Sequence, residues 1–424
     1  MEKCTVRIAV LAIFFQIQIC TSFNIYNNAC ENYNEYFVRF WSTRCYYNPD
    51  VLSDTPTIIS RHGYSLESYS LTTEDGYILT LFRIPPQTSK SHKQPVFLMH
   101  GILQNNGIWV NTGNRSLAFN LADRGYDVWL GSIRGSDFSK THRRYQTSSK
   151  EFWDFNLDTL AYFDVGEQLK FVARVTGKWG SIIYIGYSMG STLAFLYGSG
   201  YPIEANSLLS GIIALAPVLY FKDVPVVDQL VEISGPLERE LIRLHAHGLF
   251  YQSSVNKIAV SLCANAPLAC KKILEAFAGP LTDHFRPDEL LLFFSHTPSG
   301  TSVQVLKHYK QFAQTGKVRR YDYGKIDNIK NYGLSEPRGY DLRYIKVPVY
   351  LFYGSNDAMV SQEAVEKLLK ELGSFRKRIF YVPRDNEKSP FNHLDFIMAK
   401  DVKKDLYDQI FRIMREQLSE VDIV

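Results

Sequence analysis

One stretch of five residues constrains the fold more than any other part of the chain. Residues 186–190 read Gly-Tyr-Ser-Met-Gly, between an apolar run at 182–185 and a helix-like segment at 191–197. A strand that turns sharply into a helix needs glycines at the turn, because larger side chains would collide where the two elements meet. Such a turn would hold Ser188 above the edge of a sheet as a nucleophile. The pattern alone is common, and its strand–turn–helix context is what indicates a catalytic serine.

A nucleophilic serine needs a base, and an acid that orients the base. Both follow strand-like runs, in the chain order serine, acid, base. Asp357 follows the run 347–353, while His393 follows the run 378–382 and a loop. Ser188, Asp357 and His393 are therefore the predicted catalytic triad. Such a triad needs no metal ion and no organic cofactor.

Each partner of Ser188 also has a structural interpretation. Asp357 ends a Ser-Asn-Asp sequence, which is typical of turns, and a histidine such as His393 can cap a helix or lie in a core. Asp395 is a rival acid, but it follows the base in the chain. We expect it in the first turn of the final helix, where the helix dipole favours a carboxylate. The joint order and placement of the three residues favour the catalytic interpretation.

An oxyanion hole must stabilise the charge that develops during acyl transfer. One main-chain N–H is expected from the residue after the nucleophile, Met189. The other is expected after the short apolar run 95–99, where the sequence continues His-Gly-Ile-Leu. We predict that the N–H of Ile102 is this second donor.

These motifs belong to a longer resemblance to the acid lipase family, which contains gastric lipase and lysosomal acid lipase. Further matching stretches, including the long run Leu-Ala-Asp-Arg-Gly-Tyr-Asp-Val-Trp-Leu-Gly, lie at 69–79, 116–119, 121–131, 134–135, 151–155, 214–218, 298–302 and 392–396. The resemblance implies an α/β-hydrolase fold, with a mostly parallel central sheet flanked by helices and a helical cap or lid insertion. It places the family's nucleophile, acid and base on Ser188, Asp357 and His393, and the oxyanion donors on Ile102 and Met189.

The chain departs from this family at the elbow itself. The family commonly reads Gly-His-Ser-Gln-Gly, whereas Tyr187 and Met189 flank Ser188 here. Met189 offers no side-chain hydrogen-bond donor, but its main-chain N–H is retained. We therefore expect changes in pH behaviour and rate rather than loss of activity.

Length and composition agree with one large domain. The 424 residues, of which 46% are hydrophobic, can bury a substantial core. We predict a hydrolase core at 23–218 and 347–424. Residues 219–346 are far too many for a simple connection, and we predict that they form a cap or lid over the nucleophile. Their apolar runs, such as 290–294, either form the cap's own core, line an acyl-chain tunnel or form a lid that docks on lipid.

The first residues are typical of a secretory signal peptide. Lys3 and Arg7 precede or flank an apolar run at 8–15 that is too short to span a bilayer, and cleavage after Ser22 is expected. The alternative is a signal anchor. No later segment is apolar enough to be a transmembrane anchor, so we predict secretion, with the lysosome as a second destination.

Secretion changes how the cysteines are interpreted, because disulfides persist in oxidising compartments. Two of the six leave with the signal peptide, and four remain: Cys30, Cys45, Cys263 and Cys270. Three pairings are open. We expect the local ones, because each closes a short loop, and Pro267 interrupts the helix that would otherwise hold Cys263 and Cys270 too far apart. Zinc is the alternative, but no Cys-x-x-Cys supports it.

One sequon, Asn114-Arg115-Ser116, lies in a polar segment and predicts an exposed glycan on Asn114. The net charge of +4, without a basic tract, gives no sign of nucleic-acid binding.

The sequence thus predicts a lipase that hydrolyses neutral lipid esters, triacylglycerol or sterol ester, at an oil–water or membrane interface. One alternative is a short-chain carboxylesterase. Another is a catalytically silent lipid-binding or storage protein on the same fold, although such proteins usually lose a triad member. The preferred lipid, the pH optimum and the oligomeric state stay open.

Overall fold

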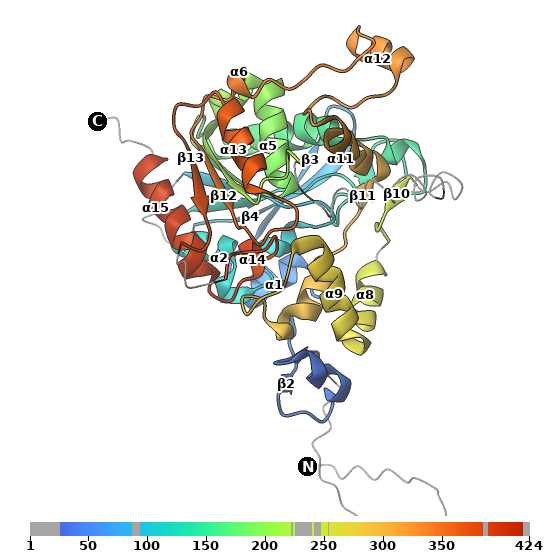
Figure 1. The fold of residues 1–424 in the computed structure, drawn as a ribbon, viewed down its shortest axis with the longest axis vertical. Coiled ribbons are helices and arrows are strands. Elements are labelled where there is room, and N and C mark those ends of the chain that lie inside the picture. Colours follow the sequence, from blue (N-terminus) through green and yellow to red (C-terminus); the bar gives the residue numbers. More distant parts are fainter. Residues whose placement is uncertain are drawn as a thin grey trace, which may run out of the picture.

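The computed structural model of the chain describes residues 26–86, 94–221, 224, 240, 247–252, 254–384 and 389–418. A nine-stranded sheet lies at its centre, in the order β13-β12-β9-β8-β5-β6-β4-β3, with β7 paired to β4. Helices pack around this sheet (Figure 1). The predicted signal peptide, 1–22, lies outside the described residues.

Most of the sheet is parallel, as the sequence predicts. Its parallel strands are β5 (Pro95–Met99), β6 (Asp127–Leu130), β8 (Ile182–Tyr187), β9 (Leu209–Leu215), β12 (Val349–Tyr353) and β13 (Lys377–Tyr381). The antiparallel strands are β3 (Glu67–Thr72), β4 (Tyr77–Ile84) and β7 (Thr141–His142). Every residue of β5, β8 and β12 is buried. Continuous burial is what helices on both faces of a parallel sheet produce.

A first group of helices lies outside the long segment between β9 and β12. They are α1 (Thr55–Arg61), α2 (Leu117–Asp123), α3 (Leu157–Thr159), α4 (Gly166–Thr176), α5 (Met189–Gly200), α6 (Pro202–Leu208), α13 (Gln362–Glu371), α14 (Asp395–Met398) and α15 (Asp408–Gln417). The helix that starts with Asp395 is only one turn long. The sequence analysis expected Asp395 in the first turn of the final helix. That expectation is wrong, because α15 follows the helix that Asp395 starts.

Between β9 and β12 lies the segment 219–346, which we call the insertion. Its described elements are β10 (Gly248–Leu249), α8 (Val255–Asn265), α9 (Pro267–Ala278), α10 (Leu290–His296), β11 (Thr301–Ser302), α11 (Val303–Thr315) and α12 (Lys325–Tyr332). All of α10 is buried, so the apolar run 290–294 contributes to a core. By contrast, Leu262 on α8 and Phe277 on α9 are 62% and 49% exposed.

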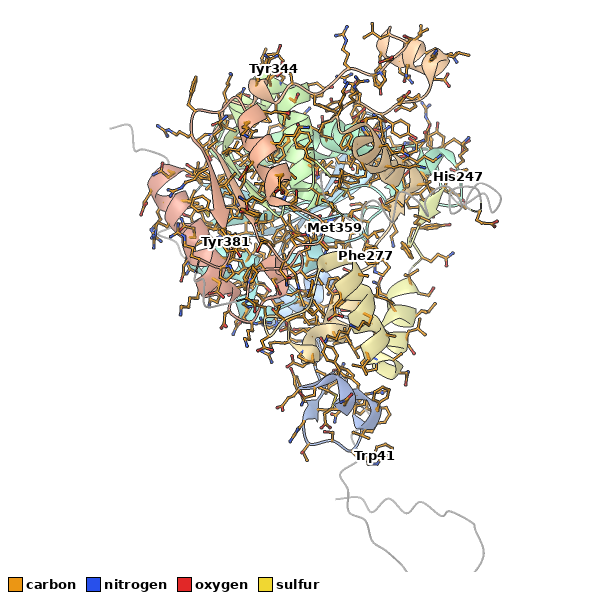
Figure 2. All side chains as sticks on the ribbon, viewed as in Figure 1. Trp41, His247, Phe277, Tyr344, Met359 and Tyr381 are labelled. Carbon is orange, nitrogen blue, oxygen red and sulfur yellow. A yellow bond between two sulfur atoms is a disulfide. The ribbon has the colours of Figure 1, made fainter. Side chains whose placement is uncertain are left out.

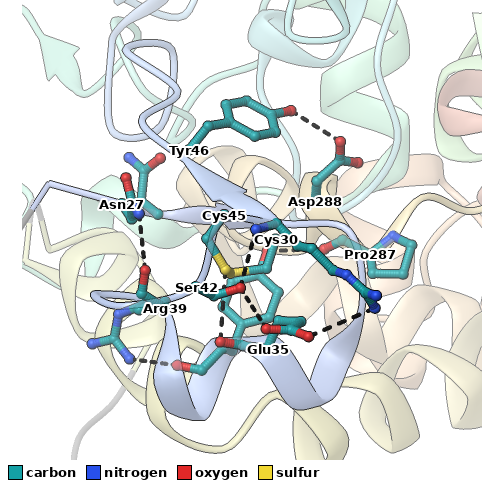
Figure 3. The surroundings of a disulfide bond; sticks show 12 residues. Asn27, Cys30, Glu35, Arg39, Ser42, Cys45, Tyr46, Pro287 and Asp288 are labelled. Atoms are coloured by element: carbon teal, nitrogen blue, oxygen red, sulfur yellow. Dashed lines mark hydrogen bonds and ion pairs between the residues drawn. A yellow bond between two sulfur atoms is a disulfide. The ribbon is translucent and has the colours of Figure 1, made fainter. Parts of the chain in front are cut away.

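Two disulfides join the local pairs of cysteines that the loop lengths favour. Cys30–Cys45 links β1 (Ala29–Cys30) to β2 (Cys45–Tyr46) and is shown in Figure 3. Cys263–Cys270 links α8 to α9 across Pro267, with 5.5 Å between the Cα atoms. All four thiols are thereby consumed, so none is free to hold zinc.

The N-terminal disulfide segment packs against the insertion. The hydroxyl of Tyr36 donates to the carbonyl of Pro287 at 2.9 Å. The hydroxyl of Tyr46 donates to Asp288 at 2.9 Å (Figure 3). Figure 1 accordingly shows β2 at one end of the molecule, next to α8 and α9. Among the described residues, no helix combines the length and apolar character needed to cross a bilayer.

Candidate active site

Ser188 occupies the turn between β8 and α5 in a backbone conformation that side chains rarely adopt. Its φ is 54° and its ψ is −118°. Such conformations cost of order 1–3 kcal/mol and persist only where the surroundings enforce them. Here the N–H of Ser188 donates to the carbonyl of Leu215 at 2.9 Å, and the N–H of Ser191 donates to the carbonyl of Ser188 at 3.0 Å. The turn is therefore held by both β9 and α5.

The two glycines of the elbow are required by the close approach of main chains. A Cβ on Gly186 would lie 2.6 Å from the carbonyl atoms of Gly190, and one on Gly190 would overlap the carbonyl oxygen of Met99. Real Cβ atoms do not approach backbone this closely. The sequence pattern is thus explained by the packing of β8, α5 and the end of β5 around Ser188.

Three loops bring the predicted triad together. His393 Nε2 lies 2.9 Å from Ser188 Oγ, and His393 Nδ1 lies 2.8 Å from Asp357 Oδ2. The Asp357 side chain is buried, and its second oxygen accepts the N–H groups of Met359 at 2.7 Å and Val360 at 3.2 Å. Ser188, His393 and Asp357 therefore form one continuous hydrogen-bonded chain. With the proton on Nδ1, Nε2 is free to accept the serine proton.

The predicted oxyanion donors lie beside this chain. Met189 is the first residue of α5, where helix N–H groups have no partner within the helix. The loop after β5 passes close to the nucleophile, since a Cβ on Gly101 would lie 3.2 Å from Ser188 Cβ. Within the part of the chain that the structure describes, neither Ile102 nor Met189 uses its N–H in a hydrogen bond to protein. The Gly101 N–H, in contrast, is bound by Gln104 at 3.1 Å.

Comparisons with known proteins identify the family. Residues 94–385 match the model of the alpha/beta hydrolase fold, and residues 55–113 match that of the partial alpha/beta-hydrolase lipase region. Gastric triacylglycerol lipase of Homo sapiens is 33% identical over 380 residues, which cover 87% of this chain and 92% of the relative. Lipase member N of Homo sapiens is 32% identical over 378 residues, with the same two coverages. The chain belongs to the acid lipase family.

As a member of this family, the chain is a serine-dependent carboxylic ester hydrolase of the lipase class. The C. elegans lipase lipl-1 is also 32% identical, over 88% of this chain and 93% of its own length. Among solved structures, DcsB in complex with its substrate analogue is 12% identical, with a TM-score of 0.51 over 84% of this chain and 99% of that one. That likeness concerns the fold alone.

Tyr187, where the acid lipase family commonly has histidine, contacts the base in this chain. Its hydroxyl donates to the main-chain carbonyl of His393 at 2.9 Å, and the two ring centroids are 5.2 Å apart. Burial, together with the charges of Asp357 and Asp395, raises the pKa of Tyr187 well above its usual range. The phenol thus stays protonated and remains a donor. Sequence reasoning noted the substitution but did not predict this contact.

Asp395 does not bond the histidine ring in this acid lipase. One of its oxygens accepts the N–H of Asn392 at 2.8 Å, and the other is buried without a hydrogen-bond partner among the described residues. Burial raises the pKa of Asp395 to about 7, with the nearby Asp357 charge adding to the rise and the Asn392 hydrogen bond opposing it. Of the two candidate acids, Asp357 is the one positioned to orient His393.

The sequon lies away from these contacts. Asn114 is exposed within a short 3-10 turn, Gly113–Arg115, while Ser116 is buried. An exposed asparagine is accessible to a glycan, and its occupancy stays a prediction.

Proposed function

We propose that the chain is a secreted lipase that hydrolyses the ester bonds of neutral lipids, triacylglycerol or sterol ester, through a Ser-Asp-His acyl-enzyme mechanism. The observation that carries this proposal is the hydrogen-bonded chain from Asp357 through His393 to Ser188, with distances of 2.8 and 2.9 Å. A nucleophile, a base and an orienting acid in this arrangement are the requirements for covalent acyl transfer.

In the proposed reaction, Ser188 attacks the ester carbonyl while His393 Nε2 takes its proton. Asp357 keeps the imidazole in the required tautomer and stabilises the imidazolium that forms. The N–H groups of Ile102 and Met189 hold the oxyanion. His393 then protonates the departing alcohol, leaving an acyl group on Ser188. Water that His393 deprotonates releases the fatty acid and restores the free serine.

The insertion supports a lipid substrate rather than a small soluble one. We propose that residues 219–346 form a cap or lid on a core of 23–218 and 347–424. Helix α9 of the insertion ends at the triad, because the carbonyl of Ala278 accepts the N–H of His393 at 2.9 Å. A segment that covers a lipase site contacts the protein on one side and the lipid phase on the other.

Exposed apolar residues lie on α9 and on the neighbouring helix α8. The α8–α9 pair presents the following large apolar side chains to solvent: Ile258, Leu262, Leu268, Ile273 and Phe277. These side chains lie on two helices that a disulfide joins, and contiguous apolar surfaces mark sites that bind apolar partners. Burial at a lipid surface would be favourable by roughly 25 cal/mol per Å². An oil–water or membrane interface is therefore the proposed partner.

Secretion is supported by three features of this chain. The leader 1–22 has signal-peptide character, two disulfides are formed, and Asn114 is an exposed sequon. Disulfides of this kind persist in oxidising compartments. The extracellular space or a digestive lumen is the proposed location, with the lysosome as the alternative.

The proposal is tested with the purified chain and its Ser188→Ala variant. Wild type should hydrolyse emulsified triolein faster than dissolved p-nitrophenyl butyrate and should react with a fluorophosphonate. Ser188→Ala should no longer be labelled by the fluorophosphonate. Its turnover number should fall by a factor on the order of 10⁶. Preference for dissolved short-chain esters, without a rise in rate once droplets form, would favour a carboxylesterase. Turnover of Ser188→Ala within tenfold of wild type would remove the triad assignment.

A further inference from the structure

Two main-chain carbonyls at the end of α9 lie between the loops that carry the acid and the base. We call residues 278–280, which begin with the last residue of α9, the bridging segment. The Ala278 carbonyl accepts the N–H of His393 at 2.9 Å and the N–H of Ala358 at 3.2 Å. Ala358 is the residue after Asp357. One carbonyl of the insertion therefore contacts both triad loops.

The second carbonyl repeats this pattern with side chains. The Pro280 carbonyl accepts the amide Nδ2 of Asn356 at 3.0 Å and that of Asn392 at 3.0 Å. Asn356 directly precedes Asp357, and Asn392 directly precedes His393. Across the bridging segment, each triad loop thus makes one main-chain and one side-chain hydrogen bond to the insertion.

Gly279 makes the close approach to the acid loop possible. Its φ is 97°, which other residues rarely adopt, and a Cβ there would overlap the Asn356 carbonyl oxygen. Figure 2 shows Phe277, at the end of α9, close to Met359 of the acid loop, in agreement with the Ala278–Ala358 hydrogen bond. The bridging segment therefore fits directly against the loop, without an intervening side chain.

We infer that the bridging segment positions the acid and the base relative to each other, and that Asn356 and Asn392 are positioning residues for the reaction. The inference rests on the proposed function of the triad. Asp357 and His393 lie on different loops, after β12 and β13, and their alignment decides the rate because small displacements of catalytic groups are costly. The insertion then has a second role besides covering the site, since it completes the arrangement of the acid and the base.

Asn356→Ala tests the role of the side-chain bonds. This change removes one hydrogen bond to Pro280 and touches neither Asp357 nor His393 directly. Ser355→Ala is the matched control, because its hydroxyl lies in the same loop and bonds Tyr381 at 2.9 Å, away from the bridging segment. Active sites are first counted by phosphonate titration, and kcat and KM are then measured on a dissolved ester, together with Tm.

Asn356→Ala should lower kcat about tenfold per active site, with KM unchanged. Ser355→Ala should stay within about twofold of wild type, with a similar change in Tm. A purely structural contribution would change Tm and the fraction of active sites but not kcat per site. Equal kcat in the two variants, or a change confined to KM, would overturn the inference.

Gly279→Ala provides a second measurement. The added Cβ would displace the bridging segment from the acid loop, and kcat should fall about a hundredfold. If this variant does not fold, Asn356→Ala alone decides. Ser188→Ala is measured in parallel: an active Ser188→Ala would defeat the proposed function, whereas an inactive one alongside an unaffected Asn356→Ala would defeat only the inference.

Discussion

The hydroxyl of Tyr187 donates a hydrogen bond of 2.9 Å to the main-chain carbonyl of His393. The residue immediately before the nucleophile thereby holds the backbone of the base. On the other side, the N–H of His393 donates to Ala278 of the insertion. The peptide groups flanking His393 are thus fixed by the elbow and by the insertion, while its ring contacts Ser188 and Asp357.

Tyr187→Phe should slow the reaction and weaken the fold. The change leaves the His393 carbonyl without its partner inside the protein, which costs about 1–3 kcal/mol of folding free energy. We expect kcat to fall about tenfold, because the base loses one of its backbone contacts. Urea unfolding and steady-state kinetics on a dissolved ester measure the two effects.

Tyr184→Phe is the control for this change. Its hydroxyl makes a comparable buried hydrogen bond to the Gly190 carbonyl at 2.8 Å, but it does not contact the base. It should cost similar stability with a smaller loss of kcat. If both variants lost kcat equally, the Tyr187–His393 bond would have no particular role in positioning the base.

Asp357→Asn and Asp395→Asn distinguish the two acids near His393. Asp357→Asn keeps the shape of the side chain but favours the wrong imidazole tautomer, and the comparable change in a serine protease costs roughly 10⁴ in turnover. Asp395→Asn should cost far less, because Asp395 bonds the N–H of Asn392 rather than the histidine ring. Turnover numbers at a single pH decide between them, and a larger loss for Asp395→Asn would contradict the assignment of the acid.

Asp395 should also make stability depend on pH. Burial raises the pKa of Asp395 to about 7, above the value of about 3.9 in an unfolded chain. Its contribution to stability is therefore fully present below about pH 4 and is lost as the pH rises through about 7. We expect Asp395→Asn to gain Tm relative to wild type as the pH rises from about 4 to about 7, the interval between those two pKa values. A constant Tm difference across that range would show that Asp395 does not titrate there.

Two buried histidines should change the pH dependence of folding stability in the opposite direction. Burial lowers the pKa of His100 and that of His296 to about 4, from an ordinary value of 6.5. The folded chain keeps both imidazoles neutral where the unfolded chain protonates them. Their contribution to stability is complete above about pH 6.5 and falls as the pH is lowered towards 4.

His296→Gln measures this effect, since glutamine does not titrate. Between pH 7 and pH 4 the Tm of this variant should fall less than that of wild type. His62→Gln is a suitable control, because His62 is only half-buried and lies outside the site. Parallel Tm curves for wild type and His296→Gln would show that His296 is not held neutral.

Local sequence was sufficient for the elbow. The apolar run, the two glycines and the following helix are neighbours in the chain, and the collision that requires glycine at 186 arises from that local crossing. The collision at 190 is with Met99 of β5, so only the motif, and not this contact, could be read locally. The strand at 95–99 and the local disulfides were predictable for similar reasons. Each depends on burial of an apolar run or on closure of a short loop.

Long-range packing decided the rest of the site. Chain order suggested Asp357 as the acid, but only the loops' positions in space show that it, and not Asp395, bonds the His393 ring.

The same holds for the bond from Tyr187 to His393 and for the contacts of Ala278 and Pro280 with the triad loops. They join segments far apart in the chain, and most use main-chain carbonyls, which every residue possesses. A carbonyl acceptor leaves no signature in a sequence. The sequence by itself therefore determined the sharp turn at Ser188 and the class of fold, and it predicted Ser188 as the nucleophile, whereas only the tertiary structure decided which groups hold Asp357 and His393 in place.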